Sequence, residues 1–407
     1  MAVDDTTVAE PRVSDPPVAE ALSAPIGRTV FTPARLRPPG LVPSPRVIFR
    51  TKRKNMSHEG RIERLNGITN LTHWRRFADR FFAVRPRPPR QLTAYLVERG
   101  FYPDKLDLYG LPNALADDYL SDLQVELLPY VNGRNRLVLE NRNLFWQVFS
   151  GVLPLARPIA LVTRRQVRVV DRLWEKVVEG GQENTRFILV ALPLDDCQAQ
   201  RSFQLEVKGG RVIAGGGEEA ASDLRGFLAA QPVDLLLCLR AWSAPGYAKL
   251  AMGVDSRLKL LFLLNPKDNL PYLISAIYLL DGIGTTPAGG DGNEYVSARI
   301  DNDTGCIASI VRVEQVSRRQ EVAAAFGDKG VLAVGDAIPG WLELVMQLQA
   351  GLRRLPLFGV IQLDVALAES GPMVVDAGAR VSAAAFQVHG PIMGGDVQRR
   401  FLKEFGV

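Results

Sequence analysis

The sequence has few cysteines and histidines, the residues that most often form disulfides in small folds or act in acid-base catalysis. It holds 3 cysteines, widely separated and without a Cys-x-x-Cys pair, which indicates neither a disulfide framework nor a zinc site. It holds 3 histidines, of which His58 and His73 precede the part of the chain where strands and helices alternate. A histidine general base would therefore have to be His389.

Long apolar runs and the common nucleotide and hydrolase motifs are also missing. No stretch reaches the ~18 apolar residues of a membrane-spanning helix, and the start of the chain has no apolar segment typical of a signal peptide. The chain has no P-loop lysine-serine motif, no G-x-G-x-x-G after a strand, no H-E-x-x-H and no G-x-S-x-G. These absences argue against P-loop, simple Rossmann, zincin and serine-hydrolase chemistry, and favour an unexported, cytoplasmic protein.

The composition predicts a folded protein with a basic segment near its start. The chain has 407 residues, of which 47% are hydrophobic and 23% charged, enough for one large or two to three smaller domains. Its net charge of +5 is unevenly distributed: residues 46–90 hold 13 Lys and Arg against 3 acids, and the rest of the chain is mildly acidic. This segment could contact nucleic acid or an anionic lipid surface, or it could be a solvated linker and helix face, since it lacks the interleaved aromatics of a single-strand binder.

The pattern of apolar residues divides the chain into four parts. Residues 1–55 are proline-rich and predict a disordered tail. Residues 56–140 have helical periodicity, residues 141–235 alternate short strands with helices, and residues 236–407 are rich in strands. We therefore expect an α+β protein in which a helical lead-in precedes two α+β subdomains with a cleft between them.

The same pattern predicts the individual elements. The expected strands are 159–163, 187–192, 203–207, 212–214, 235–239, 258–264, 273–280, 298–300 and 307–313, and the expected helices are 114–129, 144–151, 168–179, 221–230 and 341–352.

Two acids in a hairpin near the end of the chain are the strongest functional signal. Residues 359–367 and 371–378 are apolar strands joined by a Gly-Pro turn, and each contains one acid, Asp364 or Asp376. Their spacing can bring both carboxylates to one point of the hairpin, where they could hold Mg²⁺ beneath a nucleotide triphosphate. The alternative is that these are solvated turn residues or helix-cap partners.

The order of motifs from residue 119 to the end resembles the sugar-transfer-associated branch of the ATP-grasp fold, which is related to alpha-L-glutamate ligases. The resemblance rests on the acidic hairpin and on the segments around it, which are Ile338-Pro339-Gly340-Trp341-Leu342-Glu343-Leu344, Leu355-Pro356, Ala379-Arg380 and Phe386-Gln387. It implies two α+β subdomains that sandwich ATP. It also implies an ATP-dependent carboxylate-amine ligase that works through an acyl phosphate, associated with bacterial cell-surface polysaccharide biosynthesis.

The resemblance assigns roles to particular residues and names the cofactors as ATP and Mg²⁺. Asp364 and Asp376 match the family's metal ligands, while Arg142 and Lys259 match its phosphate-binding cations. The strand that contains Leu237, Cys238 and Leu239 matches the hinge that meets adenine through backbone groups. The partner substrate would be a carboxylate or an amine that the sequence does not specify.

The chain also departs from the family pattern in ways that bear on activity. Ala191 stands where the family carries a nucleotide-binding lysine, and the following loop, residues 195–200, has two acids and no glycine. Gly378 replaces a metal-binding asparagine. Two hypotheses follow: a ligase in which Arg186 or Arg201 compensates for the lost lysine, or a catalytically degenerate scaffold that serves as a binding module.

Overall fold

The computed structural model describes a large part of the chain from residue 73 onward. The described ranges are 73–83, 88–113, 115–178, 186–194, 203–208, 210–213, 219–221, 223–239, 257–265, 267–281, 295–314, 318–327, 330–368 and 371–405. The predicted tail 1–55, most of the basic segment 46–90 and the loop 195–200 lie outside these residues. We therefore draw no structural conclusion on them.

Helices make up the first described part of the chain. They are a helix over 73–83, α3 (Arg90–Arg99), α4 (Lys105–Leu108), η1 (Ala116–Asp118), α5 (Asp122–Val131), η2 (Gly133–Asn135), α6 (Arg136–Glu140) and α7 (Arg142–Phe149). The helix expected over 114–129 begins only at Asp122. There, Ser121 and Gln124 form a reciprocal capping box, with N–H···O distances of 3.2 and 2.8 Å, that fixes the start of α5.

The helical lead-in has a core of its own that continues onto a sheet. Trp74 and Phe77, which recur at helical spacing, are 2% and 1% exposed. They belong to a hydrophobic cluster that also contains Val311 and Val313 of strand β11 (Ile307–Glu314). The helical segment is thus packed against the C-terminal half of the chain.

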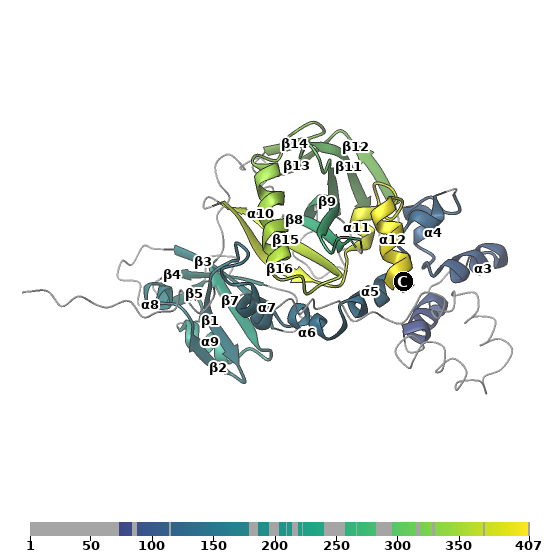
Figure 1. The fold of residues 1–407 in the computed structure, drawn as a ribbon. Coiled ribbons are helices and arrows are strands. Elements are labelled where there is room, and N and C mark those ends of the chain that lie inside the picture. Colours follow the sequence, from purple (N-terminus) through teal and green to yellow (C-terminus); the bar gives the residue numbers. More distant parts are fainter. Residues whose placement is uncertain are drawn as a thin grey trace, which may run out of the picture. The chain divides into compact units, whose positions relative to one another are not determined.

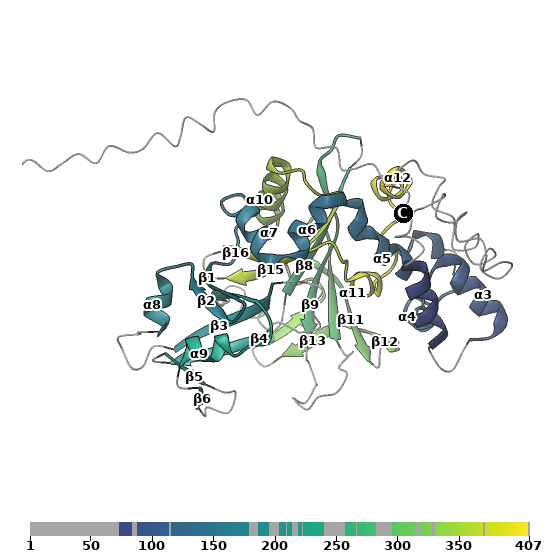
Figure 2. The same cartoon turned by 90° about the horizontal axis from the view of Figure 1, so that it is seen from below.

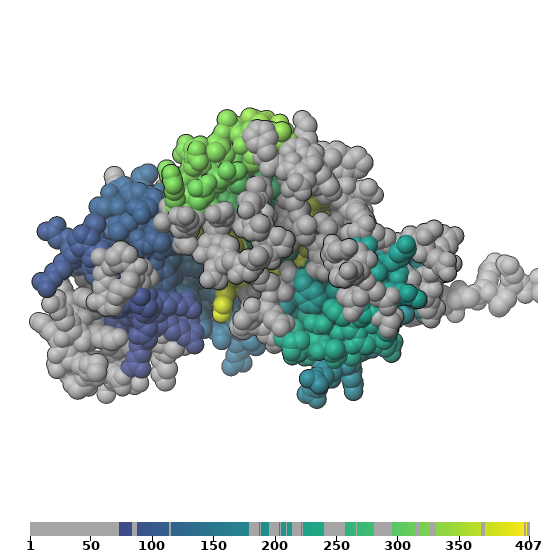
Figure 3. Space-filling model, turned by 180° about the vertical axis from the view of Figure 1, so that it is seen from behind, coloured from purple at the N-terminus to yellow at the C-terminus, as the bar shows by residue number. Residues whose placement is uncertain are grey.

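The strands of residues 158–239 form one antiparallel sheet, here called the N-terminal sheet. Its order is β2-β1-β7-β3-β4-β5-β6, and those of its residues that are visible in Figure 3 are coloured blue to teal. The strands are β1 (Pro158–Thr163), β2 (Gln166–Val169), β3 (Arg186–Pro193), β4 (Phe203–Lys208), β5 (Arg211–Ile213), β6 (Glu219–Ala221) and β7 (Leu235–Leu239), with helices α8 (Leu173–Val178) and α9 (Leu224–Ala229).

The helix predicted over 168–179 is shorter than expected. Arg164 and Arg165 have φ angles of 49° and 64°, as a tight hairpin turn of the primed type requires, so the chain folds back and residues 166–169 pair with β1. Only the remainder of the predicted segment is helical, as α8. The positive-φ turn is carried by two arginines, which the sequence pattern did not mark as turn residues.

The strands of residues 257–378 form a second antiparallel sheet, here called the C-terminal sheet. Its order is β12-β11-β10-β9-β8-β15-β16. Besides β11 its strands are β8 (Arg257–Leu264), β9 (Pro271–Asp281), β10 (Tyr295–Ile300), β12 (Arg318–Val322), β15 (Val360–Ala368) and β16 (Gly371–Gly378), and β13 (Ala324–Gly327) pairs separately with β14 (Gly330–Ala333).

Helices cover both faces of the C-terminal sheet (Figures 1 and 2). On one face, α10 (Trp341–Arg354) inserts Leu344 and Leu348 into a cluster with Leu260 of β8. On the other face, α5, α11 (Ala383–Gln387) and α12 (Asp396–Phe405) cover Leu261 and Ile277. The alternation of these residues along β8 and β9 is what distributes them to opposite faces.

The structure confirms the expected α+β class, with two antiparallel sheets and flanking helices. Within the described ranges, no helix combines the length and the apolar character needed to cross a membrane.

The connection from α7 to β1 lies along the outer strand of the C-terminal sheet. Val374 of β16 donates its backbone N–H to the carbonyl of Pro154 at 2.6 Å and accepts from the N–H of Ala156 at 2.9 Å. This pairing attaches the start of the N-terminal sheet to the acidic hairpin. It places α7 beside the hairpin, which determines the geometry of the candidate site.

Candidate phosphate and metal site

Three of the predicted site residues lie in one row across the C-terminal sheet. Asp364 of β15 is directly opposite Asp376 of β16 on one side and Lys259 of β8 on the other. Directly paired residues point to the same face of a sheet, and neighbouring strands are about 4.8 Å apart. The hairpin prediction that the two carboxylates meet at one point therefore holds for the backbone register.

Asp364 is buried among positive and amide groups. Its Oδ2 lies 2.6 Å from Lys259 Nζ and 3.7 Å from an Arg257 nitrogen, and its Oδ1 accepts from Gln362 Nε2 at 2.9 Å. Burial by itself would raise the pKa of Asp364, but the charges of Lys259 and Arg257 outweigh burial and hold that pKa below its ordinary value. Asp364 is therefore a carboxylate at neutral pH.

Arg142, the fourth predicted residue, reaches Asp376 from the start of α7. Its Nε and Nη2 donate to the two carboxylate oxygens of Asp376 at 2.9 and 2.7 Å, a bidentate pair in which the side chains are 16% and 18% exposed. Such a fork needs the planar guanidinium, so lysine could not reproduce it.

The backbone of the N-terminal sheet fixes Arg142 in this position. The Arg142 N–H donates to the carbonyl of Leu194 at 2.9 Å, and its Nη1 donates to the carbonyl of Pro193 at the end of β3. Asn141 caps α7 by accepting from the N–H of Leu144 at 3.0 Å, which sets where the helix begins. Arg142 thus joins the end of β3 to β16.

Arg257 and Gln362 were not assigned roles from the sequence, although a simple signal identifies them. Each stands two positions before a predicted site residue on the same strand, Arg257 before Lys259 and Gln362 before Asp364. Strand positions two apart share a face, so both side chains point to the same side as the residue they precede. With them, three cations face the two carboxylates of the cluster.

The carboxylate oxygens suit a magnesium ion in their chemistry, but nitrogen donors already contact each of them. Mg²⁺ prefers oxygen ligands and is commonly held by one or two carboxylates plus substrate phosphates. Here Asp364 contacts Lys259 and Gln362, and Asp376 contacts Arg142. Across the described part of the chain, no three or more His, Cys, Asp or Glu residues are grouped so as to hold a metal ion. Any metal site here would therefore need oxygen atoms from a bound substrate, such as its phosphates, in addition to the oxygens of these two acids.

Gly378 is a position where a side chain, and with it a third ligand, could be accommodated. It lies opposite Gln362 and two positions after Asp376, so a side chain there would point to the face of the two acids. A Cβ added at Gly378 would meet its nearest neighbour, the Arg380 backbone nitrogen, at 3.8 Å, which is ordinary van der Waals contact. Gly378 thus lacks the metal-binding amide of the family's asparagine, although the position can accept a side chain.

The predicted hinge residues lie on β7, a central strand of the N-terminal sheet. β7 pairs with β1 on one side and β3 on the other, so the backbone groups of Leu237 and Cys238 face strand neighbours. Cys238 is packed with Val375 of β16, and burial, reinforced by the charge of Asp376 and opposed by Arg142, raises its thiol pKa to about 12. Leu239 ends the strand, its N–H donating to the carbonyl of Arg157 at 3.3 Å.

Ala191 points away from the acidic hairpin. It is fully buried in the cluster between the N-terminal sheet and its helices, whereas Leu192 next to it belongs to the cluster that includes Val375. A lysine at position 191 in this strand register would have its charge in an apolar core, which is strongly unfavourable. The register of β3 directs the side chain of residue 191 into the apolar core, where a small apolar residue such as alanine is favourable. The side chain of Arg186 and all of Arg201 lie outside the described residues.

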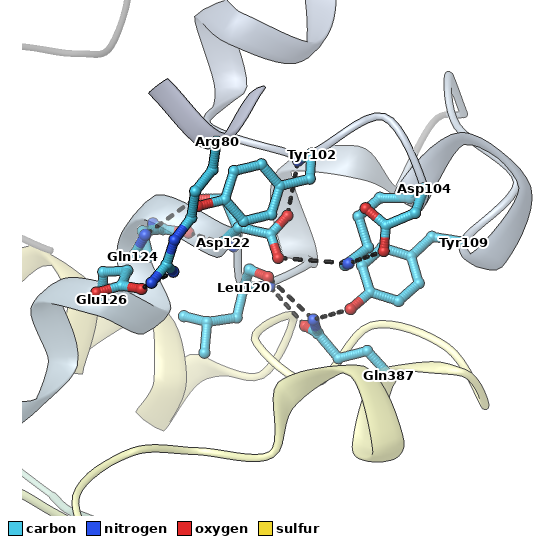
Figure 4. Close-up of polar contacts among 11 residues, drawn as sticks. Arg80, Tyr102, Asp104, Tyr109, Leu120, Asp122, Gln124, Glu126 and Gln387 are labelled. Carbon is cyan, nitrogen blue, oxygen red and sulfur yellow. Dashed lines mark hydrogen bonds and ion pairs between the residues drawn. The ribbon is translucent and has the colours of Figure 1, made fainter. Parts of the chain in front are cut away.

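A second buried polar cluster lies between the helical lead-in and α11, and Figure 4 shows its contacts. Lys105 pairs with Asp104 and, at 3.4 Å, with Asp122; burial opposes its charge, but the two acids outweigh burial and raise the pKa of Lys105. Gln387 accepts from the N–H of Leu120 at 2.6 Å and donates to its carbonyl at 2.9 Å. These groups satisfy one another, which is typical of a structural network.

Comparisons with known proteins yield structural likeness only. No family profile and no curated protein matches the chain. Similar solved structures include the ATP-grasp ligase PsnB with its minimal precursor, at 10% identity and a TM-score of 0.35, with 69% of each chain covered. N5-carboxyaminoimidazole synthetase from Staphylococcus aureus has 7% identity and a TM-score of 0.33; 66% of this chain and 52% of that one are covered. D-alanyl-alanine synthetase A from Vibrio cholerae has 7% identity and a TM-score of 0.37, with 68% and 66% covered. This chain thus spans about half the length of the synthetase from Staphylococcus aureus.

Proposed function

We propose that this chain is an ATP-grasp protein that binds Mg-ATP at the acidic hairpin and acts as an ATP-dependent carboxylate-amine ligase in bacterial cell-surface polysaccharide biosynthesis. One observation carries the proposal: Asp364 and Asp376 lie opposite each other on β15 and β16, and each is held by its own cation. The sequence resemblance names the same four residues.

The roles of the residues follow from what phosphoryl transfer requires. That reaction needs positioning and neutralisation of charge more than covalent help from the protein. Asp364 and Asp376 would hold Mg²⁺, which supplies neutralisation of phosphate charge when bound. Lys259 and Arg142 would contact phosphate oxygens, with the guanidinium suited to bidentate contact. The backbone of Leu239, at the end of β7, would contact the adenine ring.

The ion pairs of the described cluster suit an exchange of partners. Without nucleotide, Lys259 and Arg142 neutralise the two acids, so neither carboxylate is left as an unpaired buried charge. A bound triphosphate would offer the two cations another anionic partner, and the carboxylate oxygens that they contact could then ligate a metal ion, while Gln362 and the Ala377 N–H would still donate to one oxygen of each acid. In this proposal, metal and nucleotide bind together better than either binds alone.

A catalytically degenerate scaffold is the second candidate, and specific observations favour it. Ala191 is directed into the core, and Gly378 supplies no third ligand. In this alternative the chain keeps the fold and uses the cluster as a binding module with a positive excess, since Arg257, Lys259 and Arg142 outnumber the two acids.

Calorimetric titration of ATP with and without Mg²⁺ into the purified protein tests binding. We expect Mg-ATP binding that weakens at least tenfold, about 1.4 kcal/mol, in the double variant Asp364→Asn with Asp376→Asn. The matched control is Asp118→Asn with Asp171→Asn, which removes two acids paired with exposed arginines elsewhere, and it should bind as the wild type does. A folded wild-type protein that binds no ATP under either condition would contradict the proposal.

Catalysis needs a separate test, because binding alone fits both candidates. With hydroxylamine as the amine and a panel of amino and uronic acids as carboxylates, a ligase would form ADP and a hydroxamate together, in equal amounts. A scaffold would bind Mg-ATP and form neither product. The proposal also keeps a cytoplasmic location and a contact of the basic segment 46–90 with an anionic surface as expectations to be tested by fractionation and vesicle binding.

A further inference from the structure

Helix α10 presents apolar side chains to solvent on the side that points away from the C-terminal sheet. Leu342 and Met346, which are one turn apart, are 57% and 68% exposed, and Ala350 is exposed one turn further on. The other side of the helix packs on the sheet through Leu344 and Leu348. A surface helix usually has polar and charged residues along its outer side, so a helix that is apolar on both sides suggests a second packing partner.

The apolar surface continues from α10 onto the start of β9. Gln349 of α10 donates its side-chain N–H to the carbonyl of Pro271 at 3.4 Å, which places Leu270 and Tyr272 next to the helix. These two residues are 38% and 46% exposed. Gln349 is three positions after Met346, a spacing that makes helix side chains neighbours. We call this region the α10 surface, and its exposed apolar residues are Leu270, Tyr272, Leu342, Met346 and Ala350.

The charges of α10 are divided between its two ends. Glu343 lies in the first turn, whereas Arg353 and Arg354 lie in the last turn, and all three side chains are exposed. At a rise of about 1.5 Å per residue, Glu343 and Arg354 are about 16 Å apart along the axis. Among the described residues, none of the three takes part in an ion pair. The helix therefore has an acidic end, an apolar middle and a basic end.

Other charged groups near the α10 surface keep this division. Trp341 donates its Nε1–H to the carbonyl of Asn302 at 2.8 Å, so the exposed acids Asp301 and Asp303 lie at the acidic end of the helix. The turn before β9 contains one lysine and one aspartate, at positions 267–268, and so adds no net charge. The surface is thus charged with opposite signs at its two ends.

We propose that the α10 surface is the interface of a homodimer, in which α10 of a second copy of this chain packs antiparallel to α10 of the first. Glu343 of each copy then lies near Arg353 and Arg354 of the other, so opposite charges meet twice across one two-fold axis. In the same register, Met346 of each copy lies opposite Ala350 of the other, a large side chain against a small one. Burial of the apolar middle drives association, and the end charges set the antiparallel direction.

The size of the surface indicates a dimer of modest affinity. A stable interface buries about 800 Å² on each partner. The 14 residues of α10 form a helix about 21 Å long, which by itself offers a narrow contact. Leu270 and Tyr272 widen it, and tyrosine is one of the residues enriched in interfaces. We therefore expect dissociation in the micromolar range of protein concentration.

The proposed interface leaves the acidic hairpin accessible. α10 packs on Leu260 of β8, and the neighbouring Lys259 points to the opposite face of the sheet, where it contacts Asp364. Figures 1 and 2 show α10 on the side of the C-terminal sheet that lies away from α11 and α12. The inference does not require that the hairpin binds nucleotide, so either proposal can fail without the other.

Sedimentation equilibrium of the full-length protein over a wide range of concentrations tests the proposal. We expect the apparent mass to rise with concentration from the 44.7 kDa of the monomer toward twice that value. Met346→Glu keeps a good helix former but puts a charge in the apolar middle, so it should raise the dissociation constant at least tenfold. Leu115→Glu is the matched control, because Leu115 is 51% exposed before η1, outside the α10 surface. Circular dichroism checks that both variants are folded.

Charge variants test the antiparallel arrangement. Glu343→Arg, and separately Arg353→Glu with Arg354→Glu, should each weaken the dimer at least tenfold, because like charges then face each other. An equimolar mixture of the two variant proteins should form a heterodimer, since opposite signs meet again at both ends. A wild-type protein that stays monomeric at every concentration overturns the proposal. So does an equal loss of dimer in Met346→Glu and Leu115→Glu, or a mixture of charge variants that does not associate.

Discussion

Arg142 and Asp376, 234 positions apart in the chain, form a bidentate ion pair with distances of 2.9 and 2.7 Å. The pair joins the first turn of α7 to the last strand of the C-terminal sheet. Because Arg142 also donates to the carbonyl of Pro193, one side chain links β3 to β16. This arrangement suggests that the geometry of the candidate site depends on Arg142 as much as on the acids.

Replacement of Arg142 by lysine should lower stability although the charge is kept. A lysine can make one contact with Asp376 and cannot reach the carbonyl of Pro193 at the same time, so we expect a loss of about 1–3 kcal/mol in the free energy of unfolding. Urea denaturation measures it. Arg157→Lys, at the pair with Asp171 in which the arginine is 63% exposed, is the control and should change stability by less than about 1 kcal/mol. Equal losses in both variants would contradict the linking role of Arg142.

Lys259 and Asp364 should show strong coupling in a double-mutant cycle. Removal of Lys259 leaves the buried Asp364 with the more distant Arg257 as its only cation, at 3.7 Å, so Lys259→Met and Asp364→Asn should each destabilise the fold, Lys259→Met by at most about 3–5 kcal/mol. The double variant should lose less than the sum of the two, because each single variant has already lost the direct contact between Lys259 and Asp364. Chemical denaturation of the four proteins gives the coupling energy. Additive losses would show that the 2.6 Å contact contributes little.

Gly378→Asn should strengthen metal binding if the hairpin holds Mg²⁺. The added side chain would point to the face of Asp376, and its Cβ would make only ordinary van der Waals contact, so it would supply another oxygen ligand. We expect a lower magnesium requirement for ATP binding, by severalfold, in calorimetric titrations. Gly378→Val fills the same space without a ligand atom and is the matched control. An identical magnesium dependence in Gly378→Asn and in the wild type would argue for the scaffold alternative.

Gln387 should be required for attachment of the helical lead-in to α11. It is fully buried, it pairs with both backbone groups of Leu120, and its Nε2 donates to the Tyr109 hydroxyl at 3.2 Å. Gln387→Leu leaves these groups without partners, which should cost about 3 kcal/mol or more and accelerate proteolysis of the segment around α4 and α5. Gln347→Leu on the exposed side of α10 is the control. Unchanged proteolysis in Gln387→Leu would show that the apolar contacts suffice.

The free energy of unfolding should decrease as the pH is lowered, and His389 should account for part of this decrease. Burial and the charges of Arg299 and Arg319 lower the pKa of His389 from 6.5 to about 3 in the fold, so between these values the unfolded chain binds a proton that the folded chain does not. Stability contributed by this group is therefore complete above pH 6.5 and decreases as the pH falls, by about 1.4 kcal/mol per unit. The slope of unfolding free energy against pH from 6 to 5 should be smaller in His389→Gln. Equal slopes would show that the folded pKa is not depressed.

Periodicity along the chain was sufficient to predict much of the secondary structure. Strands such as β8 and β9 and helix α10 are close to their predicted limits, because alternating or helical burial of leucine and isoleucine is a local property of the sequence. The predicted helices were wrong where local turn or cap chemistry decided the limits. The capping box of Ser121 makes α5 begin later than predicted. The hairpin turn at Arg164 and Arg165 makes the first residues of another predicted helix part of strand β2.

The sequence by itself determined that the two acids lie near one point of the hairpin, because a short antiparallel connection sets the pairing of the two strands; a bulge beside Asp364 then brings it directly opposite Asp376. Only the tertiary structure decided what surrounds them. Arg142 and Lys259 come from distant segments, and their pairing with the acids depends on how α7 and β8 pack beside the hairpin. The contacts of His389 with Ser297 and Ser309 are also long-range, and no spacing in the chain signals a contact that packing alone creates.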